Sequence, residues 1–150
     1  MKKFRFSLET VLDYKNQALD ALRAEHGAIL AQVRAQEAVV EGLEREYSQV
    51  DGEFTQRKLE GLTVLDALNY EQYLRALERE VKEEYRKLSL LRRQEEQKRG
   101  QVVEARKETA TIEKLKERKL EDYRKAEQKD EELRIEEFVS TTRAMAAVGT

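Results

Sequence analysis

A mostly apolar position recurs at alternating intervals of four and three residues over the first third of the chain, and this repeat restricts the fold more than any other feature. Eleven of its fourteen positions are apolar. In order, the positions are Leu8, Leu12, Lys15, Leu19, Leu22, His26, Ile29, Val33, Gln36, Val40, Leu43, Tyr47, Val50 and Phe54. A 3.5-residue repeat held this long predicts a helix that winds with a partner helix into a left-handed coiled coil.

A stretch of weak helix formers follows the repeat. Gly52 and Gly61 lie at its two ends, and glycine is among the poorest helix formers. Thr63 followed by Asp66 is typical of a helix N-terminus, because the threonine hydroxyl accepts a hydrogen bond from a free backbone N–H of the first turn. We therefore expect a first arm over about 4–51, a connection over about 52–63, a second arm over about 64–141 and a flexible tail over 142–150.

The second arm has a less regular apolar stripe. Its early part comprises Leu65, Leu68, Leu74, Leu77, Val81, Tyr85, Leu88 and Leu91. The stripe fades from Arg92 to Gln101 and returns intermittently from Val102 onward. No proline interrupts this arm, so a continuous helix remains the expectation.

Two helical arms of unequal length predict an all-α fold, in which they form one antiparallel left-handed coiled-coil hairpin. If the chain reverses near residue 58, Leu8 lies opposite about residue 108. About thirty residues of the second arm then have no intramolecular partner, an overhang of about 45 Å at 1.5 Å per residue. Residues 113–137 are charge-rich with few apolar positions, as an unpaired helix in water requires.

The charge and the cysteine content restrict which cellular compartment and which classes of partner we expect for the protein. Charged residues make up 40% of the chain, yet the 29 basic and 31 acidic residues leave a net charge of only −2. Basic clusters alternate with glutamates, so we expect solvated faces and no nucleic-acid partner. Glu9 and Asp13 interrupt any signal-peptide core, and no run of about 18 apolar residues occurs. With no cysteine, a cytoplasmic protein is expected.

The chain offers little for catalysis. Its six glycines are too scattered for a nucleotide-binding loop, and two helices form a seam instead of a desolvated pocket. The single histidine, His26, cannot supply the paired Glu-x-x-His motifs of a bundle metal site. We interpret it, with Lys15 and Gln36, as a polar layer that fixes the alignment of the helices. No enzymatic activity, cofactor, metal or small-molecule substrate is expected.

Aromatic and leucine side chains gather near the expected reversal. They are Leu43, Tyr47, Phe54, Tyr70, Tyr73, Leu74 and Leu77. Two interpretations stay open: the group caps the closed end of the seam, or part of it forms an exposed docking surface.

Three segments resemble the FliJ family of flagellar export proteins. The opening, Phe4 to Lys15 (FRFSLETVLDYK), is similar to the start of these proteins. Asn69 to Glu78 (NYEQYLRALE) is similar to the segment after their connection, and Ile112 to Arg118 (IEKLKER) to their later charged helix. The length and the two-arm layout agree as well, so the resemblance covers essentially the whole chain.

The resemblance implies partners and site residues. FliJ-like proteins form a stalk that inserts into the hexameric export ATPase, contacts the membrane export gate and escorts export chaperones, at the cytoplasmic side of the inner membrane. Gate contact is implied for Leu43, Tyr47, Tyr70, Tyr73 and Leu77, with Glu80 and Glu84 standing where some relatives carry small or histidine residues. Contact with the ATPase ring is implied for Phe4, Phe6, Leu8, Lys114, Lys116, Arg118 and Tyr123.

Two alternatives share much of this pattern. The equivalent stalk of a virulence-type secretion system has the same architecture. A generic structural coiled coil that self-associates would also show heptads, but as a parallel dimer without a hairpin.

Overall fold

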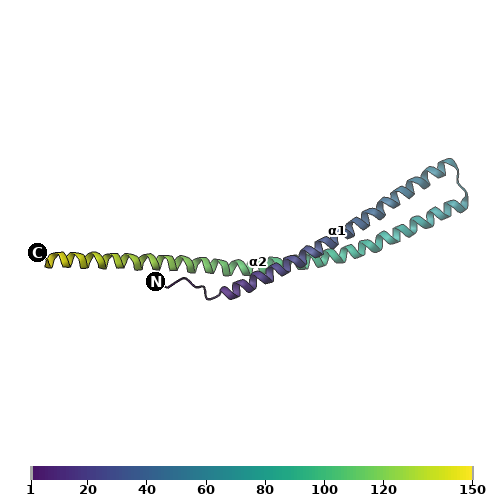
Figure 1. Ribbon diagram of the computed structural model, residues 1–150. Helices are drawn as coiled ribbons and strands as arrows, with labels where there is room; N and C mark the ends of the chain where they lie inside the picture. Colours follow the sequence, from purple (N-terminus) through teal and green to yellow (C-terminus); the bar gives the residue numbers. More distant parts are fainter. Residues whose placement is uncertain (1, 150) are drawn as a thin grey trace. The chain divides into compact units, whose positions relative to one another are not determined.

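Two long α-helices make up almost all of the computed structural model, which describes residues 2–149 (Figure 1). Helix α1 comprises Glu9–Glu60 and α2 comprises Val64–Val148, with lengths of 52 and 85 residues. The predicted all-α hairpin with unequal arms is confirmed. Within the described residues, neither helix has a stretch long and apolar enough to cross a lipid bilayer.

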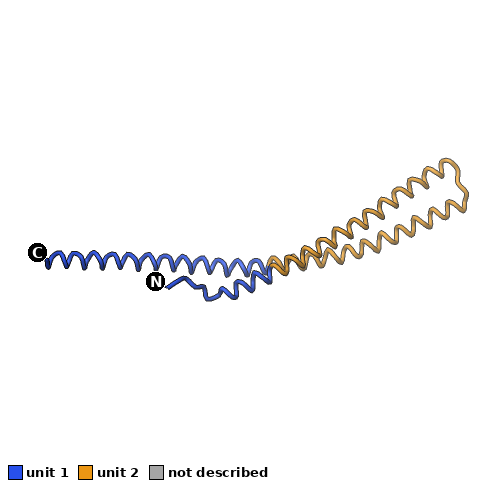
Figure 2. Tube along the Cα trace, in the orientation of Figure 1, with its two compact units in different colours: residues 1–19, 104–150 blue, residues 20–103 orange. Residues whose placement is uncertain are grey.

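The chain divides into two compact units (Figure 2). Unit 1 comprises residues 1–19 and 104–150, and unit 2 comprises residues 20–103. Unit 2 contains the connection between the helices, whereas unit 1 contains both ends of the chain. Each unit buries side chains from α1 against side chains from α2.

The connection between the helices consists of only Gly61, Leu62 and Thr63. Gly61 has a φ of 102°, a left-handed conformation that glycine adopts without a Cβ penalty. The Thr63 hydroxyl accepts a hydrogen bond from the Asp66 backbone N–H at 3.1 Å, so the predicted N-cap is present. These three residues stop α1 and start α2.

Residues 52–60, which the sequence placed in the connection, belong to α1. Gly52 costs about 1 kcal/mol relative to alanine inside a helix. Phe54 offsets that cost because it is buried in the contact with α2. Tertiary packing therefore overrides the local helix propensity and shortens the connection.

The core of unit 2 follows the predicted heptad positions of α1. Val33 and Val40 form a buried cluster with Leu88 of α2, and the partly buried Ile29 and Leu91 pack against it. Closer to the connection, the buried side chains are Phe54, Leu74 and Leu77. The core is a narrow seam because only one stripe of each helix meets the other.

The row of α2 that meets α1 differs from the predicted stripe. From Ala67 to Thr109 the half-buried or buried residues recur at strict intervals of three and four, and every other residue in that range is exposed. The row comprises Ala67, Tyr70, Leu74, Leu77, Val81, Glu84, Leu88, Leu91, Glu95, Lys98, Val102, Ala105 and Thr109. Leu65, Leu68 and Tyr85 lie off it and are exposed. The stripe seemed to fade from Arg92 to Gln101 because Glu95 and Lys98 occupy the seam positions there, and Glu84 is a further charged residue of the seam.

Polar side chains of α1 meet these seam residues in unit 2. His26 Nε2 lies 2.9 Å from Glu95 Oε1, and Glu25 accepts a bond from Lys98 Nζ at 2.8 Å. Gln36 Nε2 donates to the Glu84 backbone carbonyl at 3.0 Å and also to its carboxylate. Each polar layer is satisfied, which is what a partly buried polar group requires.

Unit 1 packs the start of α1 along α2. Leu12, Leu19 and Thr109 are buried, and the Thr109 hydroxyl donates to the Ala105 carbonyl at 2.8 Å. Lys15, rather than Leu8, lies opposite residue 108, with Lys15 Nζ 2.9 Å from Glu108 Oε2. The expected alignment is therefore one heptad off, because α1 continues to Glu60 and the chain reverses later.

The two ends of the chain also differ from expectation. Residues 4–8, placed in the first arm, precede α1 and are not helical. Residues 142–148, expected in a flexible tail, belong to α2, and Thr150 lies outside the described residues. Contacts of the N-terminal residues reach Tyr123, so the unpaired part of α2 is shorter than the thirty residues expected.

Candidate interaction surfaces

The predicted gate-contact residues lie in unit 2, where the structure gives them different exposures. Leu43, Tyr47 and Tyr70 are half-buried, whereas Tyr73 is exposed. Leu77 is only 3% exposed and lies in the contact between the helices. Leu77 therefore supports this surface from below, and the accessible atoms belong mainly to the other four residues.

Tyrosine hydroxyls tie the two helices together along the edges of the seam in unit 2. Tyr47 donates to Glu78 at 3.0 Å, Tyr70 to Glu53 at 3.1 Å and Tyr85 to Glu44 at 2.8 Å. Tyr73 donates to Glu46 in the same way. Each bond crosses from one helix to the other, so each ring is held in place while part of it stays accessible to a partner.

These bonds change the ionisation of the tyrosines. The hydrogen bond to Glu78 raises the pKa of Tyr47, and the bond to Glu46 raises the pKa of Tyr73. The bond to Glu44 likewise raises the pKa of Tyr85. The cause is the same for all three tyrosines. The carboxylate accepts a hydrogen bond from the neutral hydroxyl, but it repels the phenolate that forms when the hydroxyl loses its proton.

Two aromatic rings stack near the connection. Phe54 and Tyr70 have ring centroids 5.0 Å apart and an interplanar angle of 4°. Lys58 Nζ lies 3.8 Å from the centroid of the Phe54 ring, and the Arg57 guanidinium lies 5.9 Å from the centroid of Tyr70. Each cation lies over the face of one ring, where the negative face of the ring attracts it.

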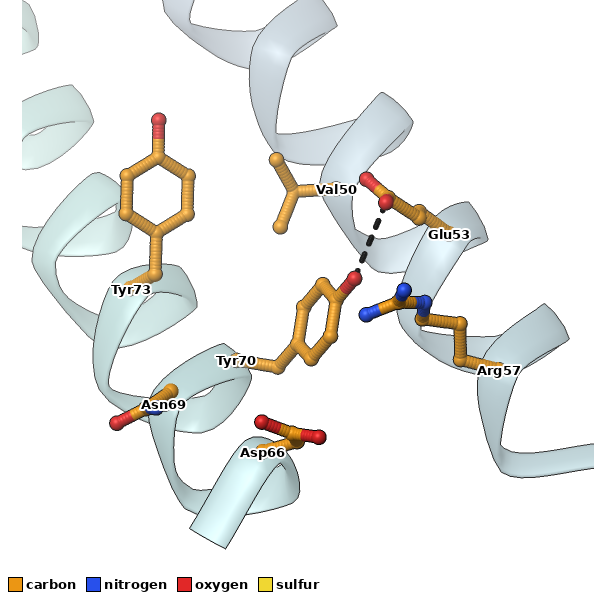
Figure 3. Close-up of a pocket in the computed structure, with 7 residues that line it drawn as sticks. All are labelled: Val50, Glu53, Arg57, Asp66, Asn69, Tyr70 and Tyr73. Atoms are coloured by element: carbon orange, nitrogen blue, oxygen red, sulfur yellow. Dashed lines mark hydrogen bonds between the residues drawn. The ribbon is translucent and has the colours of Figure 1, made fainter. Parts of the chain in front are cut away.

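A shallow hollow of about 350 Å³ opens beside this stack (Figure 3). Its lining residues are Val50, Glu53, Arg57, Asp66, Asn69, Tyr70 and Tyr73. Figure 3 shows the Tyr70 hydroxyl reaching across to Glu53, with the Arg57 side chain beside it. The mixture of aromatic rings with charges of both signs suits a protein surface better than a small apolar ligand.

A second hollow, of about 440 Å³, lies farther from the connection. Glu44, Tyr47, Ser48, Glu78 and Val81 line it. Tyr47 therefore borders one hollow and Tyr73 the other, so the predicted gate-contact tyrosines have accessible concave surface next to them.

The two glutamates singled out by the resemblance have different environments. Glu80 is exposed, whereas Glu84 is half-buried in the seam. Hydrogen bonds from Gln36 and then Lys87 lower the pKa of Glu84, because they favour its charged form. Glu84 thus acts within the helix contact, which a surface comparison does not anticipate.

The predicted ATPase-contact residues lie in unit 1. Phe4, Phe6 and Leu8 are half-buried, and the Phe4 ring lies 5.6 Å from the Tyr123 ring. The Tyr123 hydroxyl donates to the backbone carbonyl of Lys2. Burial raises the pKa of Tyr123, and the Glu127 carboxylate raises it further because it disfavours the phenolate.

The three predicted basic residues of unit 1 separate into two groups. Lys116 Nζ lies 2.8 Å from Glu9 Oε2 and is half-buried. Lys114 and Arg118 are exposed. Lys116 therefore fastens the start of α1 to α2, and Lys114 and Arg118 are the residues presented outward.

A group of exposed apolar residues near the connection escaped the sequence analysis. Leu59 lies in the last turn of α1, and Val64, Leu65 and Leu68 lie in the first turns of α2. Leu65 and Leu68 had been assigned to the seam. The strict spacing that starts at Ala67 was the pattern that could have excluded them.

Among the described residues, no three His, Asp or Glu side chains lie close enough together to hold a metal ion. His26 instead pairs with Glu95 across the seam. Its environment agrees with the interpretation of a polar layer.

Two amphipathic helices that meet along one seam, with exposed aromatic and charged surface on both units, define a coiled-coil interaction protein. The chain matches the protein-family model described as "Flagellar FliJ protein" over residues 4–145. It therefore belongs to the FliJ family, and is a non-enzymatic component of the flagellar export apparatus. No curated protein and no solved structure matches the chain.

Proposed function

We propose that the protein is the stalk of the flagellar type III export apparatus, acting on the hexameric export ATPase and on the cytoplasmic domain of the export gate. It also escorts export chaperones, and works at the cytoplasmic face of the inner membrane. The observation that carries the proposal is a family match over residues 4–145 in a chain built almost entirely from two helices.

Unit 2 supplies the gate-contact surface in this proposal. Tyr47, Tyr70 and Tyr73 offer ring edges held by hydrogen bonds to glutamates of the opposite helix, and Leu43 borders them. Fixed aromatic side chains lose little conformational entropy on binding, which favours tyrosine as an anchor in interfaces.

Unit 1 supplies the ATPase-contact surface. Lys114 and Arg118 are exposed, and the neighbouring Phe4 and Tyr123 rings pack together. We infer that the two cations meet acidic groups inside the ring, while Phe4, Phe6 and Leu8 keep the N-terminal segment on α2.

ATP hydrolysis measured on mixing tests the proposal. The chain should raise the hydrolysis rate of its cognate hexameric ATPase while hydrolysing no ATP alone. The double variant Lys114→Glu with Arg118→Glu should lose most of the stimulation, because its charge reversal makes ring contact repulsive.

A matched control makes the same charge change in unit 2. The double variant Arg75→Glu with Arg79→Glu also replaces two exposed basic residues of α2 by glutamate. It should still stimulate ATP hydrolysis. If wild-type protein leaves the ATPase rate unchanged, the stalk proposal is wrong. Equal loss in both double variants would refute the assignment of the contact to unit 1.

A further inference from the structure

Four large apolar side chains surround the connection in unit 2 and are exposed to solvent. Leu59 is 81% exposed, Val64 78%, Leu65 68% and Leu68 49%. They come from the last turn of α1 and the first turns of α2, on either side of Gly61–Thr63 (Figure 1). These four residues are called the tip crown below.

The fold itself does not require the tip crown. The α1–α2 seam begins at Phe54 and Ala67, and none of the four residues belongs to it. Polar side chains at the same positions would leave the seam intact and would avoid exposing apolar surface. Four exposed apolar side chains around one connection, on a chain with 40% charged residues, therefore point to a binding surface.

The charges around the tip crown argue against a lipid surface. Arg57, Lys58, Glu60 and Asp66 are all exposed, and their charges cancel. Binding to an anionic membrane draws on clustered Lys and Arg side chains near the surface. A neutral rim around an apolar centre instead resembles the polar rim of a protein–protein interface.

The size of the tip crown argues against a second copy of the chain. Four partly exposed side chains offer a few hundred Å², so two tips meeting end to end would bury well under the roughly 1,200–2,000 Å² of a stable specific interface. A convex tip gains more contact inside a concave site, whose walls also reach the sides of the helices.

We propose that the tip crown seats end-on in an apolar pocket with a polar rim on the cytoplasmic domain of the export gate. This inference rests on the gate contact in the proposed function and deepens it, because that contact was assigned only to the tyrosines along the sides of the helices. The gate then touches unit 2 at two places, the tip crown and the surface around Tyr73. Within the tip crown, Leu65 and Leu68 are the central residues.

Calorimetric titration of the full-length chain with the purified cytoplasmic domain of the gate tests the inference. Leu65→Ser with Leu68→Ser should weaken binding by about tenfold or more, as loss of central apolar contacts does. The matched control is Leu90→Ser with Val103→Ser, two off-seam positions of α2 that are 49% and 44% exposed. The control should bind within about twofold of wild type, on the same scale of effects.

Circular dichroism melting checks that both double variants keep their fold. If Leu65→Ser with Leu68→Ser lowers the melting temperature, Leu59→Ser on α1 provides an independent test of the same surface. Tyr73→Ala separates this inference from the proposed function. Weakened binding by Tyr73→Ala together with unchanged binding by the tip-crown variants refutes the tip-crown inference and leaves the gate contact standing.

Three other results would also overturn the inference. Failure of wild-type protein to bind the gate domain removes the gate contact and the tip-crown site with it. Flotation with vesicles of phosphatidylglycerol and phosphatidylethanolamine that depends on Leu65 and Leu68 identifies a lipid surface instead. A wild-type dimer in sedimentation equilibrium that these substitutions dissolve identifies a second copy.

Discussion

Tyrosine–glutamate pairs are the most frequent polar link between the helices in unit 2. A neutral hydroxyl donates to a charged carboxylate in each pair, so removal of the hydroxyl proton turns attraction into repulsion. The raised pKa values of Tyr47, Tyr73 and Tyr85 follow from this arrangement.

These pKa values predict a loss of stability at alkaline pH. A pKa raised by folding contributes stability that is fully present below the unfolded pKa, near 10, and is lost as pH rises through the folded pKa. The melting temperature should therefore fall between about pH 9 and pH 12, a window set by that reference value. The triple variant Tyr47→Phe, Tyr73→Phe and Tyr85→Phe should lose less over the same range.

Melting followed by circular dichroism at fixed ionic strength measures this difference, and a spectrophotometric titration of tyrosinate gives the pKa values directly. The triple variant changes only these three hydroxyls. An equal alkaline loss in both proteins would assign the effect to other groups and contradict the prediction.

The single polar residues in the seam were predictable from the sequence, but their partners on the other helix were not. Lys15, His26 and Gln36 interrupt an otherwise apolar repeat, and their interpretation as polar layers agrees with their contacts. Their partners could not be predicted, because the choice of partner depends on the alignment of two helices. That alignment depends in turn on where α1 ends.

Helix α1 was predicted better than α2 because its seam is mostly apolar. The seam of α2 keeps the same spacing but includes Glu84, Glu95 and Lys98, which hydropathy alone places on the surface. Tyr47 and Tyr73 were correctly placed beside the closed end, whereas the burial of Leu77 and the exposure of Leu68 depend on the rotation of α2 about its axis.

Gly52 and Gly61 both have open space around them, but they differ in backbone conformation. Gly52 lies within α1, and Gly61 lies just after it with a φ of 102°. At both positions a Cβ atom would meet nothing within 4 Å. Backbone conformation, and not space, therefore distinguishes the two sites.

Alanine at each glycine should shift stability in opposite directions. Gly52→Ala should stabilise by about 0.5–1 kcal/mol, because alanine favours the helix and restricts the unfolded chain. Gly61→Ala should destabilise by roughly 1–2 kcal/mol, because a Cβ disfavours the left-handed conformation. Urea unfolding of the two variants beside wild type measures both values. A stabilising Gly61→Ala would mean that the turn rearranges.

At the scale of the whole chain, the end of α2 differs from everything before it. All described residues from 131 onward are exposed, including Leu133, Ile135 and Phe138. This segment is helical although it is not packed against α1. Its helicity rests on good helix formers and on local pairs such as Arg134 with Asp130, whose charged atoms are 3.5 Å apart.

Deletion of residues 131–150 should therefore leave the stability of the remaining helix pair nearly unchanged. Substitutions of exposed surface residues usually change stability by no more than about 0.5 kcal/mol. The melting temperature should move by no more than about 2 °C, whereas the total helical signal should fall. A large drop in melting temperature would show that the segment packs against the rest of the chain in solution.

The polar layers of unit 2 also restrict how its helices can move. Sliding one helix past the other by seven residues would place His26 against Leu88 or Val102, and Gln36 against Leu77 or Leu91. Glu84 and Glu95 would then face apolar side chains, which is costly for a carboxylate. Polar layers at unequal intervals therefore favour a single alignment of the two helices. A force or torque applied to unit 2 must therefore bend or rotate both helices together, because the helices cannot slide past each other by one heptad.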